Sequence, residues 1–211
     1  MTVQPGTVLI VVDLQNDFCT ATRHQHNPDT LHAVTTNTAR AIDTARTHGT
    51  EVVFVRFIGD LEHQPPSWRH RDATRGRPPK CREGTWGAQF HTVTPAPGER
   101  VFTKKACFDA FLHTDLHHHL TRRAAHHLVF AGLYTDVCVD TTARTAFQKG
   151  YHITILTDCT TALHLADDDI LRFQRALYGA RTTTHDHPHT WTRFTPDNTE
   201  PPSPTPHTAS A

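Results

Sequence analysis

The stretch LVFAGLYTDVCVDTTARTAFQKGY, residues 128–151, predicts a buried strand, a short turn and a helix in immediate succession. The apolar run 128–131 has the length and residue types of a strand, and Gly132 interrupts it. Apolar residues then recur at helical spacing until Gly150 ends the helix: Val139, Ala143, Ala146 and Phe147. A strand leading directly into a helix is the repeating unit of an α/β protein.

Within this stretch, Cys138 lies close to the start of the helix. Thr135 suits the N-cap and Asp136 suits the first turn. Unpaired N–H groups and the positive end of the helix dipole favour a thiolate at Cys138 and predict a nucleophile. Free cysteines are also often small buried hydrophobic residues, and this segment alone does not decide between the two interpretations.

A second buried strand ends in a carboxylate. Residues 8–12, VLIVV, are the continuous apolar run of a strand covered on both faces, and Asp13 follows directly. Desolvation there raises the pKa of a carboxyl towards the range of a general base. Alternatively, Asp13 caps the following turn, which Asp17 could also do.

The segment 100–111, RVFTKKACFDAF, predicts a short strand that delivers two lysines into a loop. Taken alone, Lys104 and Lys105 are typical of a solvated surface pair.

Strand and helix patterns alternate along the whole chain, which predicts a three-layer α/β fold with a mostly parallel sheet. We expect strands near 8–13, 51–57, 100–103, 128–132, 152–157 and 181–184, and helices near 29–48, 114–125, 137–149 and 166–178.

Four segments together resemble the isochorismatase-like hydrolases, or cysteine hydrolases, which include nicotinamidases, N-carbamoylsarcosine amidases and ureidoacrylate hydrolases. They are DLQNDF at 13–18, EGTWGA at 83–88, Lys105 six residues before Phe111, and GLYTDVCV at 132–139. The resemblance covers about residues 7–184.

The resemblance implies a six-stranded sheet in the order 3-2-1-4-5-6, with the site at the switch point between the strands ending at Asp13 and Gly132. It implies that Cys138 is the nucleophile, Asp13 the base and Lys105 the cation that holds both. It also implies a cis peptide at Leu133–Tyr134 and an oxyanion hole formed by the backbone N–H groups of Tyr134 and Cys138. We expect Lys105 and the helix N-terminus to lower the pKa of the Cys138 thiol below the ~8.5 of free cysteine.

The function that follows is hydrolysis of a small non-peptide amide, ureide or lactam through a thioester. We expect the substrate pocket to be lined by aromatic and amide side chains: Gln15, Phe18, Trp86, Phe108 and Tyr134. One alternative is a vinyl ether hydrolase of the isochorismatase type, which needs no thiol. Another is a non-catalytic binding or scaffold protein on the same fold. The intact Asp13, Lys105 and Cys138 favour the amidohydrolase.

Composition excludes several other classes. Lys plus Arg and Asp plus Glu number 21 each, which argues against nucleic acid or anionic membrane as the main partner. No stretch has the pattern of a signal peptide or a membrane span, so we expect a cytoplasmic protein. The five scattered cysteines predict neither a disulfide framework nor a structural zinc site. We expect a single domain over 1–197, a disordered tail over 198–211, and a homo-oligomer.

Residues 60–99 are rich in proline and show no regular pattern, so we expect a long ordered loop that covers the site. Its stretch 69–82 holds six Arg or Lys residues against one Asp. This excess could attract an anionic substrate or a partner subunit, although a solvated basic loop is the more common case. We expect no metal and no cofactor, because the Asp-x-His pattern of the nicotinamidase branch is missing after the second strand, where the sequence reads FIGDLEH at 57–63. The histidines at 117–119 and at 185–189 do not by themselves predict a metal site.

Overall fold

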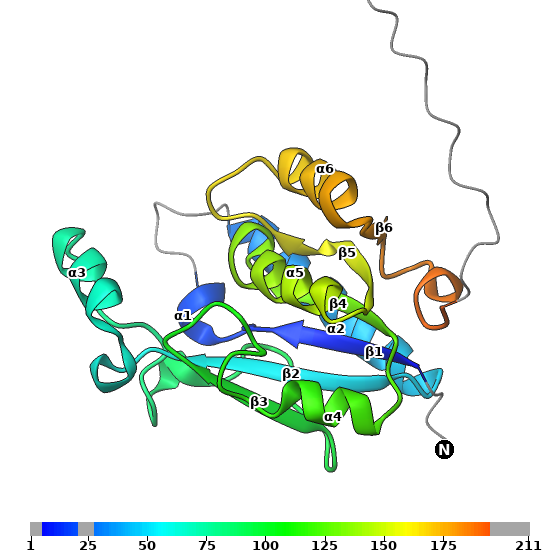
Figure 1. The fold of residues 1–211 in the computed structure, drawn as a ribbon, viewed down its shortest axis with the longest axis horizontal. Helices are drawn as coiled ribbons and strands as arrows, with labels where there is room; N and C mark the ends of the chain where they lie inside the picture. The colour runs from blue at the N-terminus through cyan, green and yellow to red at the C-terminus, as the bar shows by residue number, and fades with distance from the viewer. Residues whose placement is uncertain (1–5, 21–27, 195–211) are drawn as a thin grey trace, which may run out of the picture.

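A computed structural model of the protein describes residues 6–20 and 28–194. Its centre is a six-stranded sheet in the order β3-β2-β1-β4-β5-β6 in which every neighbouring pair is parallel. The strands are β1 (Thr7–Val12), β2 (Glu51–Ile58), β3 (Arg100–Lys105), β4 (His127–Leu133), β5 (His152–Thr161) and β6 (Arg181–Thr183). The predicted three-layer fold and strand order are confirmed (Figure 1).

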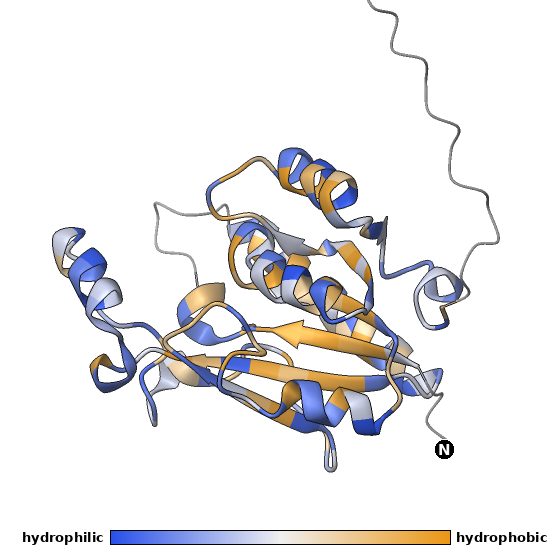
Figure 2. Ribbon diagram, in the orientation of Figure 1, coloured by the Kyte–Doolittle hydropathy of each residue, from blue (hydrophilic) through white to orange (hydrophobic). Residues whose placement is uncertain are grey.

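Helices cover both faces of the sheet. They are α1 (Asn16–Cys19), α2 (Pro28–Thr47), α3 (Pro66–Thr74), α4 (Leu116–Arg122), α5 (Asp140–Gln148) and α6 (Asp167–Tyr178). One core joins the sheet to α4, α5 and α6, and a second core joins the opposite face to α2. The strands therefore lie in an apolar interior, which Figure 2 shows most clearly along β1 and β2.

The centre of the sheet is closely packed where β1 meets β4. All six residues of β1 are buried, and Val12 pairs with Gly132. Gly132 has a φ of 112°, and a Cβ there would lie 2.0 Å from the carbonyl oxygen of Val12. Only glycine fits this position, so the break in the apolar run allows the two central strands to approach each other where they end.

The region 60–99 is more regular than we predicted. It contains α3 and two short helical turns, Leu61–His63 and Trp86–Ala88. Pro66 starts α3 at a position where a proline is favourable, because no N–H is needed there. The helix buries no residue, so it lacks the apolar periodicity from which helices are recognised in a sequence.

Helix α3 extends from the end of the molecule at which β1 points, that is, beyond the carboxyl ends of the strands (Figure 1). Among the described residues no helix combines the length and apolar character needed to cross a membrane. The predicted disordered tail, 198–211, lies outside the described residues.

Candidate active site

Asp13, Lys104 and Cys138 meet at the carboxyl ends of β1, β3 and β4. Lys104 Nζ lies 2.7 Å from Asp13 Oδ2 and 3.2 Å from Cys138 Sγ. The exposed fraction of the side chain is 1% for Asp13 and 0% for Lys104, and Cys138 is also buried. The switch point of the sheet thus brings a carboxylate, an ammonium and a thiol into direct contact, as a parallel sheet of this order predicts.

The lysine of this cluster is Lys104, so the assignment to Lys105 is wrong. Successive side chains of a strand point to opposite faces. In β3, Phe102 and Lys104 are buried whereas Lys105 is exposed. The alternation of buried residues from Phe102 indicates that Lys104 points inward. The assignment to Lys105 came from the spacing to Phe111, which the family resemblance supplied.

The ammonium of Lys104 has an acceptor for each of its three N–H donors. Besides Asp13 and Cys138, it donates to the backbone carbonyl of Cys107 at 3.1 Å. Burial favours the neutral amine, but the negative charge of Asp13 and the hydrogen bonds to Asp13 and Cys138 outweigh burial and hold the pKa of Lys104 above its ordinary value. A fixed positive charge therefore lies between the carboxylate and the sulfur.

Burial raises the pKa of the Asp13 carboxyl, while the charge of Lys104 and hydrogen bonds from Lys104 and Cys138 act in the opposite direction. The net shift is upward, so Asp13 is a stronger base than an ordinary carboxylate. This is the direction expected from its position at the end of a buried strand.

The pKa of the Cys138 thiol is raised, which contradicts the expected lowering. Burial is the largest cause, and Asp13 adds to it, whereas Lys104 opposes both. The helix N-terminus and the ammonium of Lys104 lower the pKa of the thiol less than burial and the nearby carboxylate raise it. The resting thiol is therefore protonated and needs a base.

Replacing Asp13 with asparagine is expected to lower the pKa of the Cys138 thiol by at least about one unit, because a negative charge next to the sulfur is lost while Lys104 remains. The measurement is the pH dependence of the rate at which iodoacetamide alkylates Cys138 in both proteins. A thiol pKa that rises in Asp13→Asn contradicts the arrangement of charges described above.

The backbone around Cys138 departs from a regular helix. The segment Thr135–Val139 forms a π-helical turn ahead of α5, and Tyr134, rather than the predicted Thr135, occupies the N-cap. The carbonyl of Tyr134 accepts hydrogen bonds from the N–H groups of Val137 and Val139 but not from that of Cys138. The peptide between Leu133 and Tyr134 is cis. Irregular turns of this kind recur at functional sites, and a sequence does not reveal them.

A cavity of about 440 Å³ opens next to these residues, and Asp13 and Cys138 both line it. Three of the expected substrate-binding residues, Phe18, Phe108 and Tyr134, are in its wall. The structure also adds wall residues that sequence reasoning missed, most of them from β2 and the segment that contains α3: Phe57, Gly59, Gln64, Trp68, Arg71, Arg75, Arg77, Pro78 and Lys80.

Gln15 and Trp86 do not line the cavity, contrary to expectation. Gln15 is fully buried, and its side chain bonds the backbone of Phe57 and Ala88. The side chain of Trp86 is 59% exposed, while its carbonyl accepts a hydrogen bond from Asn16. These residues join the DLQNDF and EGTWGA segments to each other, so they serve the architecture around the site.

Asp136 fixes another part of the cavity wall. Its carboxylate accepts hydrogen bonds from the backbone N–H groups of Leu163, His164 and Leu165. Leu163 and His164 line the cavity. The turn that carries Cys138 therefore also positions part of the binding wall.

In the described part of the chain, one group of three side chains could hold a metal ion: Asp158, Cys159 and His185. None of the three lines the cavity. Asp60 lies in the segment where the Asp-x-His pattern of the nicotinamidase branch was expected. Its carboxylate accepts a hydrogen bond from the Glu83 N–H.

Dialysis against EDTA is expected to leave hydrolysis unchanged, because the group at Asp158 lies outside the cavity that holds Cys138. The check is the rate of ammonia release before and after dialysis, with metal content measured on the same samples. A loss that zinc, iron or manganese restores contradicts this expectation.

Comparison with known proteins agrees with the fold. The chain matches the isochorismatase domain over residues 7–187, and it belongs to that family. Ureidoacrylate amidohydrolase RutB of Methylorubrum extorquens is 32% identical over 173 residues, which cover 74% of this chain and 69% of the relative. The protein of the same name from Yersinia enterocolitica is 29% identical over 195 residues, with coverages of 84% and 83%.

Among solved structures, N-carbamoylsarcosine amidase from Thermoplasma acidophilum superposes with a TM-score of 0.72 at 24% identity. The match covers 86% of this chain and 97% of that protein. It supports the fold, and the resemblance drawn from the four sequence segments is confirmed.

Proposed function

We propose that this chain is an amidohydrolase that cleaves the C–N bond of a small non-peptide amide or ureide, with Cys138 as the covalent nucleophile. The observation that carries the proposal is the contact of Lys104 Nζ with both Asp13 and Cys138 beside the cavity. The named relatives, an amidohydrolase and an amidase, support the class of reaction.

In the first half of the reaction, Asp13 takes the proton of the Cys138 thiol as the sulfur attacks the carbonyl carbon. A base is needed because the thiol is protonated at rest. The C–S bond forms, the electron pair of the carbonyl moves to its oxygen, and N–H groups of Tyr134 and Cys138 stabilise that oxyanion. The C–N bond then breaks, and the proton held by Asp13 goes to the nitrogen, which leaves as ammonia or an amine.

In the second half, water enters and Asp13 removes one of its protons. The hydroxide adds to the thioester carbonyl, the C–S bond breaks, and the sulfur takes the proton that Asp13 removed from water. Lys104 stays charged throughout and stabilises the sulfur whenever it carries negative charge. The net reaction converts an amide and water into a carboxylic acid and ammonia or an amine.

The position of Cys138 in the cavity wall weighs against the vinyl ether hydrolase, which needs an acid–base pair but no thiol. A non-catalytic role does not account for a buried lysine held between a carboxylate and a thiol, because burying such charges destabilises a fold unless they serve a purpose.

The test is a screen for ammonia release over small amides, ureides and lactams, with the Cys138→Ala protein as the control. Turnover of at least one compound by the wild type alone is the expected result. Turnover that Cys138→Ala retains would contradict Cys138 as the nucleophile, and no turnover of any compound would favour the vinyl ether hydrolase or the binding protein.

A further inference from the structure

Three side chains of metal-binding types meet at the β5–β6 edge of the sheet: Asp158, Cys159 and His185. One ligand atom of each, a carboxylate oxygen, the sulfur and an imidazole nitrogen, lies within 4.8 Å of the other two. Asp158 is the centre of the group, because its carboxylate is bonded to Nδ1 of His185 and also accepts a hydrogen bond from Cys159 Sγ at 3.5 Å. The three donors are therefore close enough for one ion to contact all of them.

An irregularity of the sheet explains how two neighbouring residues reach the same point. In a regular strand, Asp158 and Cys159 would point to opposite faces. The pairing of β4 with β5 shifts register in this stretch, between Phe130 and Gly132 of β4. Bulges of this kind redirect side chains and recur near functional sites. The departure from regular pairing therefore brings the carboxylate and the sulfur together.

His185 joins the group from the segment that follows β6. This strand has only three residues and lies at the edge of the sheet, and its pairing with β5 ends at Leu156. Beyond that point, the backbone N–H of His185 donates to Asp158 Oδ1 at 3.0 Å. The histidine is thus held by its backbone as well as by its ring. Two of the three ligands are oriented by the protein itself, as metal ligands usually are.

The burial of the group leaves an entrance for an ion. The side chains of Asp158 and His185 are 24% and 15% exposed, whereas Cys159 is fully buried behind them. An ion that reaches the carboxylate and the imidazole is therefore also next to the sulfur. Thiolate, imidazole and carboxylate together suit Zn²⁺, whereas Mg²⁺ and Ca²⁺ favour oxygen ligands.

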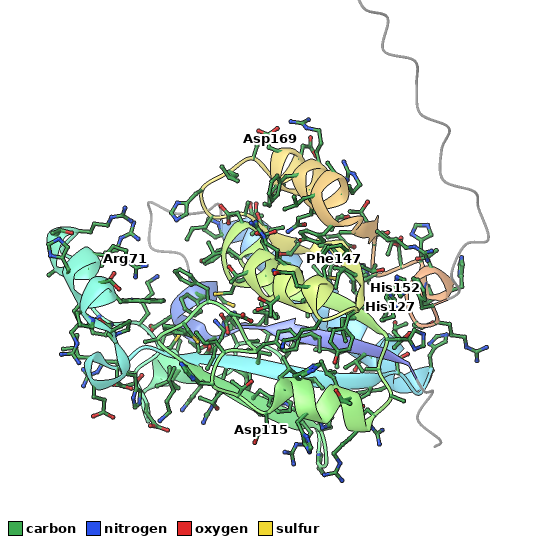
Figure 3. The ribbon with its side chains drawn as sticks, viewed as in Figure 1. Arg71, Asp115, His127, Phe147, His152 and Asp169 are labelled. Atoms are coloured by element: carbon green, nitrogen blue, oxygen red, sulfur yellow. The ribbon has the colours of Figure 1, made fainter. Side chains whose placement is uncertain are left out.

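The histidines at the other end of the same strands differ from this group. Figure 3 shows His127 and His152, the first residues of β4 and β5, close to each other. Both rings pack on Phe194, with centroids 4.8 and 4.2 Å away, and the ring nitrogens of His127 are bonded to the hydroxyls of Thr7 and Thr154. These rings serve the packing of the fold. The group at Asp158 is distinguished by three different donors, not by an abundance of histidine.

We propose that Asp158, Cys159 and His185 bind a Zn²⁺ ion that fastens the irregular stretch of β5 to the segment after β6. The thiol releases its proton to water as the ion binds, and a water molecule completes four-coordination. None of the three residues lines the cavity that holds Cys138, so the ion takes no part in hydrolysis. The proposal is independent of the proposed hydrolase function.

The first measurement uses Co²⁺, which accepts the ligands of Zn²⁺ and absorbs in the near ultraviolet when a thiolate binds it. Titration of the EDTA-dialysed, full-length wild type is expected to produce this thiolate-to-metal absorption, with saturation near about one equivalent of Co²⁺. Excess Zn²⁺ should remove the absorption, and excess Mg²⁺ should not. Zn²⁺ should also raise the thermal midpoint of the protein, because an ion bound only by the folded state stabilises it.

Two variants test the ligands. Cys159→Ser is expected to lose the thiolate absorption. Cys159→Ser and His185→Gln should each weaken Zn²⁺ binding, measured by competition with a chromogenic chelator, by at least about tenfold, since even the loss of an outer partner of a metal ligand costs this much. Cys19→Ser and His189→Gln are the matched controls, because Cys19 is a buried free cysteine and His189 a histidine near His185, both outside the group. Both controls, and Cys138→Ala, should keep the absorption and the affinity.

A Co²⁺ spectrum without thiolate absorption, or absorption that persists in Cys159→Ser, overturns the site. Absorption that is lost in Cys138→Ala would place the ion at the candidate active site and overturns it as well. His185 is partly exposed, so His185→Gln keeps the test decisive if Cys159→Ser does not fold: an unchanged Zn²⁺ affinity in this variant contradicts the proposal. Ammonia release tests the hydrolase separately, and its rate should be equal for the zinc-loaded and the EDTA-dialysed protein.

Discussion

Replacing Cys138 with alanine is expected to abolish amide hydrolysis, with kcat falling by at least about a thousandfold. Loss of a covalent nucleophile typically costs several orders of magnitude, because the remaining groups cannot replace the bond that it forms. Cys138 is the thiol that contacts Lys104 and lines the cavity with Asp13. The measurement is kcat for the best compound of the ammonia-release screen.

The fold should survive this change, because alanine removes one buried sulfur and adds no charge. Cys107→Ala is the matched control, since Cys107 is also a buried free cysteine of this region but does not line the cavity. We expect Cys107→Ala to keep nearly full activity, and both variants to keep the circular dichroism spectrum of the wild type. Activity above about one per cent in Cys138→Ala would contradict the nucleophile assignment.

Replacing Lys104 with methionine is expected to reduce kcat by a similar factor, whereas Lys105→Met should be nearly silent. Methionine keeps most of the length of the side chain but removes the ammonium that contacts Asp13 and Cys138. Without it, negative charge on the sulfur is no longer stabilised and the pKa of Asp13 rises further, because Lys104 lowers it. Both variants are compared in kcat with the same compound.

Loss of a buried partner can also unfold a protein, since it leaves the other charge uncompensated. The thermal midpoint of Lys104→Met is therefore measured with and without a bound competitive inhibitor, and activity is compared only where the protein is folded. A folded Lys104→Met with wild-type activity, or an inactive Lys105→Met, would show that the exposed lysine is the functional one.

The sequence predicted the sheet well for a physical reason. Strands buried on both faces must be continuous apolar runs, and β1 and β4 are runs of this kind in which every residue is buried. The strand order followed from the resemblance to a family, which the four segments carried. Helix α3 was not predictable in this way, because it buries no residue and so leaves no periodic pattern.

Asp13 and Cys138 could be placed at the site because Asp13 directly follows one buried strand and Cys138 lies in the turn after another, where a parallel sheet places its site. The identification of the lysine depended on which of two neighbouring residues points inward. The sequence of a short, partly exposed strand such as β3 indicates this direction only weakly. The pKa of the thiol was mispredicted because burial is a property of the whole fold. Local features such as a helix N-terminus or one cation do not reveal it.

The basic stretch shows the same limit. Composition alone favoured a solvated loop, yet Arg71, Arg75 and Arg77 line the cavity. They differ in pairing: Asp72 pairs with Arg71, whereas no carboxylate among the described residues pairs with Arg75 or Arg77. Neither the pairing of charged side chains nor the direction of a turn can be predicted from residue composition.

The central claim is that hydrolysis passes through an acyl group on Cys138, and partitioning with hydroxylamine tests it most directly. Two amides with the same acyl group, one that releases ammonia and one that releases methylamine, are hydrolysed in the presence of hydroxylamine, and the ratio of hydroxamate to acid is measured for each. If both pass through one acyl-enzyme, the two ratios are equal, because the leaving group has departed before the products divide. Formation of acid without hydroxamate, or a ratio that depends on the leaving amine, would contradict the covalent mechanism.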